Sequence, residues 1–113
     1  MALRRKRIDV ERESALYLDA VRRASAHGPA GRSALTAAHE GFVLAMIRAG
    51  RPTRAREALD ALLRARPRCA ATWTLAARLA RAAGDVETAA RRREVARVLA
   101  TADGRGLPAA GVG

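Results

Sequence analysis

The sequence predicts an all-α fold of about five helices. Glycine and proline divide the chain into intervals of helix length. Within each interval apolar residues recur at spacings of three and four, and no segment alternates apolar and polar residues over the length of a strand. Half of the residues are hydrophobic, but the only aromatic side chains are Tyr17, Phe42 and Trp73, and alanine supplies much of the rest. Alanine buries little apolar area, so we expect close helices around a thin core.

The first two helices are expected over 9–26 and 34–49. The run His27–Gly31 separates them, Ser33 is the expected N-cap of the second helix, and Gly50 ends it. The expected buried face of the first helix consists of Tyr17, Leu18, Val21 and Ala24. That of the second consists of Leu35, Ala38, Phe42, Val43 and Met46.

Three further helices are expected over 53–65, 69–83 and 86–101. Thr53 and Asp85 are the expected N-caps of the first and last of these. The inward residues of the third helix are Ala55, Ala58, Leu59, Leu62 and Leu63. Those of the fourth are Trp73, Ala76, Ala77 and Ala80, and those of the fifth are Val86, Ala89, Ala90 and Ala96.

We expect one helical domain over 9–104, preceded by a basic arm at 1–8 and followed by a glycine-rich, disordered tail at 105–113. The arm is similar to the basic start of an export signal, but a charged segment and not an apolar run follows it. No segment has the apolar length of a membrane span. The single cysteine cannot form an internal disulfide. A cytoplasmic protein is the expectation.

A helix, a glycine turn and a second helix recur with an offset of 34 residues, which carries Gly50 onto Gly84 and Ala55 onto Ala89. The second unit reads Trp73-x-x-Ala76-Ala77-x-x-Ala80, followed by Gly84-Asp85. This pattern resembles the tetratricopeptide repeat over about residues 36–102. Three positions depart from that repeat. Val43 stands where the repeat usually has a small residue, and Arg93 stands where it usually has a large apolar residue. Thr101 occupies the position of the closing proline. The resemblance implies antiparallel helix hairpins stacked as a short solenoid, and an alanine-rich antiparallel bundle is the alternative.

The resemblance also implies a concave groove lined by the first helix of each pair. Its residues would be Glu40, Leu44, Ile47 and Arg48 from the first unit, and Thr74, Leu75, Arg78 and Arg81 from the second. An apolar floor with arginine edges suits a protein partner with an acidic or amphipathic segment, or a second copy of the chain. The alternative is that these arginines form an ordinary solvated face. The expected function is that of a non-catalytic adaptor or accessory subunit.

The net charge of +11 makes a nucleic acid the alternative partner. The candidate site is the basic arm, with Arg4, Arg5, Lys6 and Arg7, which could track phosphates. The arm has few aromatic neighbours for base stacking. Arginine-rich, alanine-rich helices are also typical of proteins from GC-rich genomes, so the charge alone does not decide between the partners.

We expect no enzymatic activity, no metal site and no cofactor. The serines have no glycine elbow or histidine–carboxylate pair at a suitable spacing, and no glycine-rich phosphate loop is present. His39 occupies the place of Trp73 in the repeat and is expected to be a packed core residue. Cys69 begins a helix, where a thiol can have a low pKa, although a lone buried cysteine is the commoner case.

Overall fold

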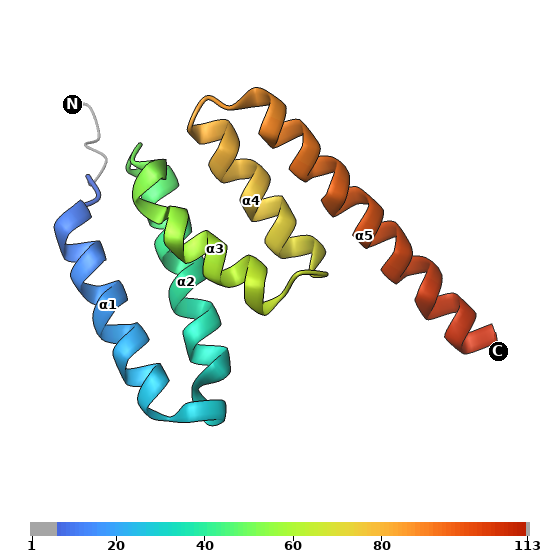
Figure 1. Cartoon of the computed structure of the whole chain (residues 1–113), viewed down its shortest axis with the longest axis horizontal. Coiled ribbons are helices and arrows are strands. Elements are labelled where there is room, and N and C mark those ends of the chain that lie inside the picture. Colours follow the sequence, from blue (N-terminus) through green and yellow to red (C-terminus); the bar gives the residue numbers. More distant parts are fainter. Residues whose placement is uncertain (1–6, 113) are drawn as a thin grey trace, which may run out of the picture. The chain divides into compact units, whose positions relative to one another are not determined.

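The structure is a computed structural model that describes the backbone of residues 7–112 and the side chains of residues 7–102. The predicted all-α class is confirmed, because every regular element in this range is helical. The elements are α1 (Val10–Ala26), η1 (Gly28–Gly31), α2 (Arg32–Arg48), η2 (Pro52–Ala55), α3 (Arg56–Ala65), α4 (Ala70–Ala82) and α5 (Val86–Val112) (Figure 1). None of the helices described is both long and apolar enough to cross a bilayer.

The chain divides into two compact units, the N-terminal unit Met1–Ala61 and the C-terminal unit Leu62–Gly113. The boundary falls inside α3. The first unit contains α1, α2 and the beginning of α3, and the second contains the end of α3 with α4 and α5.

In the N-terminal unit, α1 and α2 form an antiparallel hairpin held by aromatic side chains (Figure 1). The rings of Tyr17 and Phe42 are stacked with centroids 4.3 Å apart. The Tyr17 hydroxyl also lies 2.8 Å from Nδ1 of His39. Val43 and Met46, on the buried side of α2, are completely inaccessible to solvent. The first helix therefore covers α2 and contributes directly to the core of this unit.

The hairpin turn between α1 and α2 depends on a close approach at Gly31. A Cβ atom at this position would lie 1.9 Å from the carbonyl oxygen of Ala24, which is the most buried residue of α1. Only glycine allows the two backbones to come this close. The turn residues then run directly into α2 through a 3₁₀ turn.

In the C-terminal unit, α4 and α5 form the second hairpin (Figure 1). Over Val86–Ala102 the buried residues of α5 are Ala89 and Ala96. The guanidinium of Arg92 adds a hydrogen bond of 3.1 Å from Nη1 to the carbonyl oxygen of Ala76 on α4. Small side chains allow the two helices to pack closely, and the hydrogen bond from the Arg92 side chain to the backbone of α4 stabilises this packing.

The turns after α2 and α4 have the same backbone hydrogen bonds. The Gly50 N–H donates to the Ile47 carbonyl (3.1 Å) and the Arg51 N–H to the Met46 carbonyl (2.8 Å). In the second turn the Gly84 N–H donates to Arg81 (3.0 Å) and the Asp85 N–H to Ala80 (2.9 Å). Both glycines have positive φ angles, 71° and 83°. Each turn is a Schellman motif, which requires a residue in the left-handed region and therefore favours glycine.

Several predicted details are wrong. Ser33 lies inside α2, whose N-cap is Gly31, because the preceding 3₁₀ turn already has helical geometry. Thr53 likewise lies inside η2 and caps nothing. Asp85 does cap α5, accepting from the Thr88 N–H at 3.1 Å.

Some of the predicted inward faces are also wrong. Leu18 is 65% exposed, and Val86 and Ala90 are exposed as well. Leu18 follows Tyr17 directly, so it points about 100° away from the ring that packs on α2.

The last helix continues to Val112, past its predicted end near residue 101. The backbone of 105–112, predicted to be disordered, thus belongs to α5, while Gly113 and the side chains of this segment lie outside the described residues. Helix extension adds one hydrogen bond for each residue fixed, so a formed helix can pass weak helix formers such as Gly104 and Gly106.

Candidate functional site

The predicted groove residues are divided between the two units. In the N-terminal unit, Glu40, Leu44 and Ile47 are half-buried and Arg48 is exposed. Their spacing places them on one face of α2, beside the fully buried stripe that contains Val43 and Met46. α2 therefore offers an apolar strip of limited exposure with a charged residue at each end.

In the C-terminal unit, the predicted residues lie on α4 and differ in accessibility. Leu75 is only 8% exposed, so it belongs to the core and is not the accessible floor that the sequence suggests. The hydroxyl of exposed Thr74 donates back to the Ala70 carbonyl at 3.0 Å, which occupies its proton. Arg78 and Arg81 are exposed and, being three residues apart, lie on the same face of the helix.

The guanidinium groups of Arg78 and Arg81 form no ion pair with any side chain in the described range 7–102. Other arginines do: Arg22 and Arg23 pair with Asp19, Arg91 with Glu87, and Arg97 with Glu94. The opposite face of α4 is buried through Ala76, Ala77 and Ala80. The helix that carries these two cations is therefore firmly packed.

Three of the predicted basic-arm residues, Arg4, Arg5 and Lys6, lie outside the described residues. Arg7 is exposed and borders a shallow open depression of about 270 Å³ at the start of α1. Its lining residues are Arg7, Ile8, Asp9, Arg12, Glu13 and Leu16. Two arginines are balanced there by two carboxylates, so this depression has no surplus charge for a phosphate.

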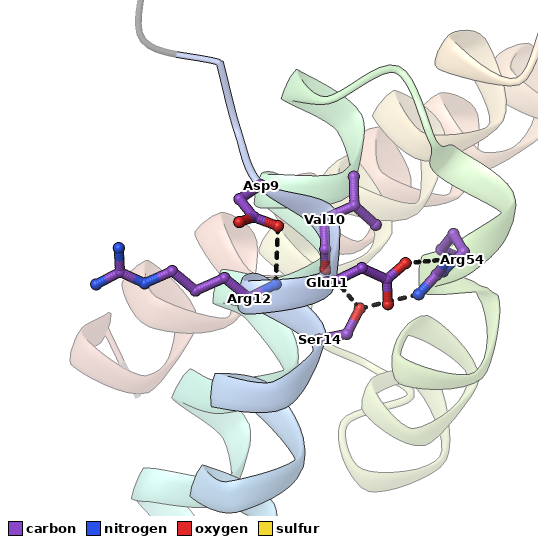
Figure 2. A network of polar contacts seen from close by, with 6 residues as sticks. All are labelled: Asp9, Val10, Glu11, Arg12, Ser14 and Arg54. Carbon is purple, nitrogen blue, oxygen red and sulfur yellow. Dashed lines mark hydrogen bonds and ion pairs between the residues drawn. The ribbon is translucent and has the colours of Figure 1, made fainter.

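A polar network at the start of α1 uses an arginine for structure (Figure 2). Arg54 in η2 lies with Nη1 3.5 Å from Oε2 of Glu11 and donates from Nη2 to the Ser14 hydroxyl at 3.1 Å. Ser14 in turn donates to the Val10 carbonyl at 2.8 Å, and Asp9 caps α1 by accepting from the Arg12 N–H at 3.1 Å. The network links η2 to α1 within the N-terminal unit. The part that Arg54 plays could not be predicted from the sequence, because Arg54 is 43 residues from Glu11 and 40 residues from Ser14.

The Tyr17–His39 pair is a half-buried hydrogen-bonded contact between two titratable side chains. Burial lowers the pKa of His39 and, with the nearby Glu57 carboxylate, raises the pKa of Tyr17. Both shifts favour the neutral forms, so the hydroxyl and a neutral imidazole share one hydrogen bond. Phe42 stacks on the tyrosine ring, and the pair thus serves as a polar part of the helix–helix contact.

No cluster of three or more His, Cys, Asp or Glu side chains that could hold a metal ion occurs in the part of the chain that the structure describes. The serine with the best-defined environment, Ser14, uses its proton on a backbone carbonyl. This geometry offers no activated nucleophile at that serine.

The sequence also missed exposed valines on α5. Val95 and Val98, three residues apart on one face, are 37% and 47% exposed. The sequence does contain a signal for their exposure. The spacing of the two valines relative to the buried Ala89 and Ala96 places them on a different side of the helix from these alanines.

No protein-family model matches the chain, and no curated protein or solved structure is detectably similar to it.

Proposed function

We propose that this chain is a non-catalytic protein–protein interaction module, built from two tetratricopeptide-like hairpins, that binds a partner segment carrying carboxylates. The proposed repeat units start at α2 and at α4, so the first unit differs from the α1–α2 hairpin described above. Two identical Schellman turns with an offset of 34 residues, each followed by a buried alanine at Ala55 or Ala89, support this relationship.

The arginine pair Arg78 and Arg81 is the observation that carries the proposed function. Both guanidinium groups are exposed, share a helix face and have no carboxylate partner in the range 7–102. A guanidinium can bind a carboxylate through two parallel hydrogen bonds, and cations held on a packed helix lose less freedom on binding. Acidic side chains on an amphipathic segment are the matching chemistry.

Apolar side chains left exposed by both units support the same function. Leu16 and Leu18 on α1, and Val95 and Val98 on α5, remain accessible after each hairpin has packed. Covering them by a partner would stabilise the folded state by mass action. A second copy of the chain would serve the same purpose, so a homo-oligomer is included in this proposal.

The test compares charge reversals at two places, using a partner recovered from the native host with the unaltered chain. Arg78→Glu combined with Arg81→Glu should abolish binding of that partner, because two attractive contacts become repulsive. Arg4→Glu combined with Arg5→Glu is the matched control, with the same change in net charge, and should leave binding nearly intact. The opposite result would make the basic arm the site.

A nucleic-acid-binding function remains the second candidate, favoured by the net charge of +11. Salt separates the two functions. Binding through six to ten phosphates loses roughly a factor of 10³–10⁵ in affinity between 50 and 200 mM salt, with a log-linear dependence. A protein partner that combines apolar contacts with two ion pairs should show a much smaller loss over the same range.

A further inference from the structure

The segment that joins α3 to α4 has an arginine at every second position. Arg64, Arg66 and Arg68, here called the link arginines, are all exposed. None of them forms an ion pair with a side chain in the described range 7–102. From Leu62 to Gly84 the sequence contains five arginines and no aspartate or glutamate. The link arginines therefore lie in a stretch of the C-terminal unit that supplies no carboxylate of its own.

The backbone of this link is fixed by three hydrogen bonds. The Arg66 N–H donates to the Leu62 carbonyl at 2.8 Å, and the Cys69 N–H donates to the Arg66 carbonyl at 3.3 Å. Indole Nε1 of Trp73, on α4, donates to the Pro67 carbonyl at 2.7 Å. A backbone that is already fixed loses less conformational entropy when its side chains bind a ligand.

Trp73 brings an aromatic ring into contact with the link. Its ring nitrogen is bonded to Pro67, which lies between Arg66 and Arg68, and the residue remains partly accessible to solvent. Nucleic-acid bases stack on accessible aromatic rings with little regard to sequence, while neighbouring cations bind the backbone phosphates. The link thus combines cations with an aromatic neighbour, a combination that the sequence does not offer in the basic arm.

The exposed side chains around the link are polar or small. None of the large hydrophobic side chains that are exposed in the described range lies between residues 62 and 74. A protein interface has an apolar centre, and a helix that binds a bilayer surface has an apolar face. Protein–nucleic acid interfaces are more polar and much more positively charged. These properties favour a phosphate chain as the ligand of the link.

We propose that the link arginines and Trp73 bind single-stranded nucleic acid, with phosphates on the guanidinium groups and a base on the indole ring. This goes beyond the protein-binding function, because it uses neither Arg78 and Arg81 nor the basic arm. A guanidinium can hold a phosphate through two parallel hydrogen bonds. Phosphate contacts and stacking carry little base identity, so binding should show little sequence preference.

The first test uses the fluorescence of Trp73, which is the only tryptophan in the chain and therefore reports on this site alone. Titration of the full chain with a short single-stranded oligothymidine should quench the emission, because a base stacks on the indole ring. Phosphatidylserine vesicles and a glutamate-rich peptide, at the same concentration of negative charge, should leave the emission unchanged. No quenching by the oligonucleotide, or equal quenching by the vesicles or the peptide, would overturn the proposal.

The second test separates the link from the general positive charge by means of two triple variants with the same loss of charge. The link variant is Arg64→Gln combined with Arg66→Gln and Arg68→Gln, and the control is Arg32→Gln combined with Arg51→Gln and Arg56→Gln. The control residues are exposed arginines of the N-terminal unit without an ion pair in the described range 7–102. Circular dichroism checks that both variants retain their helices.

The measured quantity is the slope of log affinity for the oligothymidine against log salt concentration. Each phosphate contact with a single strand contributes about 0.7 to this slope, so loss of three contacts should reduce its magnitude by about 2 in the link variant. The control should change the slope by less than about 0.5, because its arginines contact no phosphate. Equal changes in the two variants would mean that binding depends on the overall charge, and would contradict a site at the link.

Discussion

The two hairpins, α1–α2 and α4–α5, are packed in different ways. In the N-terminal unit α1 and α2 are joined by the stacked rings of Tyr17 and Phe42, above the buried Val43 and Met46. In the C-terminal unit α5 buries only alanines over its described side chains. A core of large side chains is most sensitive to removal of atoms, whereas a core of alanines is most sensitive to their addition.

The largest expected effect is the loss of an aromatic ring from the N-terminal unit. Phe42→Ala should lower the free energy of unfolding by about 3–5 kcal/mol, because it leaves a cavity and removes the stack on Tyr17. Denaturant unfolding measures the change. The control Leu18→Ala, at a position 65% exposed, should stay within about 0.5 kcal/mol. Similar losses in both variants would mean that α1 does not pack on α2 through Tyr17.

The turns provide the second comparison. Gly31→Ala should destabilise by about 2–3 kcal/mol, because its Cβ would meet the Ala24 carbonyl oxygen at 1.9 Å. Gly84→Ala has open space around its Cβ and suffers only from the φ angle of 83°, which should cost about 1 kcal/mol. Thermal unfolding of the two variants gives the order. A larger loss at Gly84 would contradict the close approach of α1 and α2.

Addition of atoms to the C-terminal unit should have the next largest effect. Ala89→Phe should overpack the contact with α4 and destabilise by about 1–3 kcal/mol. Ala90→Phe, at the exposed neighbouring position, is the matched control and should change little. An unchanged melting temperature for Ala89→Phe would show that the predicted repeat register is wrong.

The sequence was sufficient for the fold class and for most of the core. Spacings of three and four identified Phe42, Val43 and Met46 on α2, and the offset of 34 residues identified the alanines Ala55 and Ala89. Helix periodicity and glycine turns are local properties, so they can be read from one chain.

What the sequence could not predict depends on contacts between distant segments. Leu75 and Leu18 were given the wrong accessibility, because the side of a helix that becomes covered is decided by its neighbour. The hydrogen bonds of Arg54 and Arg92 could not be predicted either, because their partners are distant in the sequence. The partners of Arg54 lie on α1, and the partner of Arg92 is a carbonyl on α4. In an arginine-rich sequence each arginine is expected to be a solvated surface charge, yet Arg54 and Arg92 form hydrogen bonds between separate helical elements.

The smallest expected effect is a pH dependence of the N-terminal unit. The pKa of His39 is lowered by burial in the folded state, so the unfolded chain binds its proton more readily. Stability from the neutral imidazole is therefore present above the unfolded pKa of about 6.5 and is lost as the pH falls below it. Denaturant midpoints should decrease between pH 7 and pH 5. His39→Gln, which does not titrate but can still accept from Tyr17, should flatten this decrease, and an unchanged slope would exclude His39.

Hydrogen exchange tests the proposed function most directly. Exchange is measured on the full chain with and without the partner recovered by the unaltered protein. Binding through Arg78 and Arg81 predicts slower exchange in peptides from α4, at residues 74–81, with no change in the basic arm at 1–8. Slower exchange confined to the arm, with α4 unaffected, would contradict the assignment of the binding surface to α4.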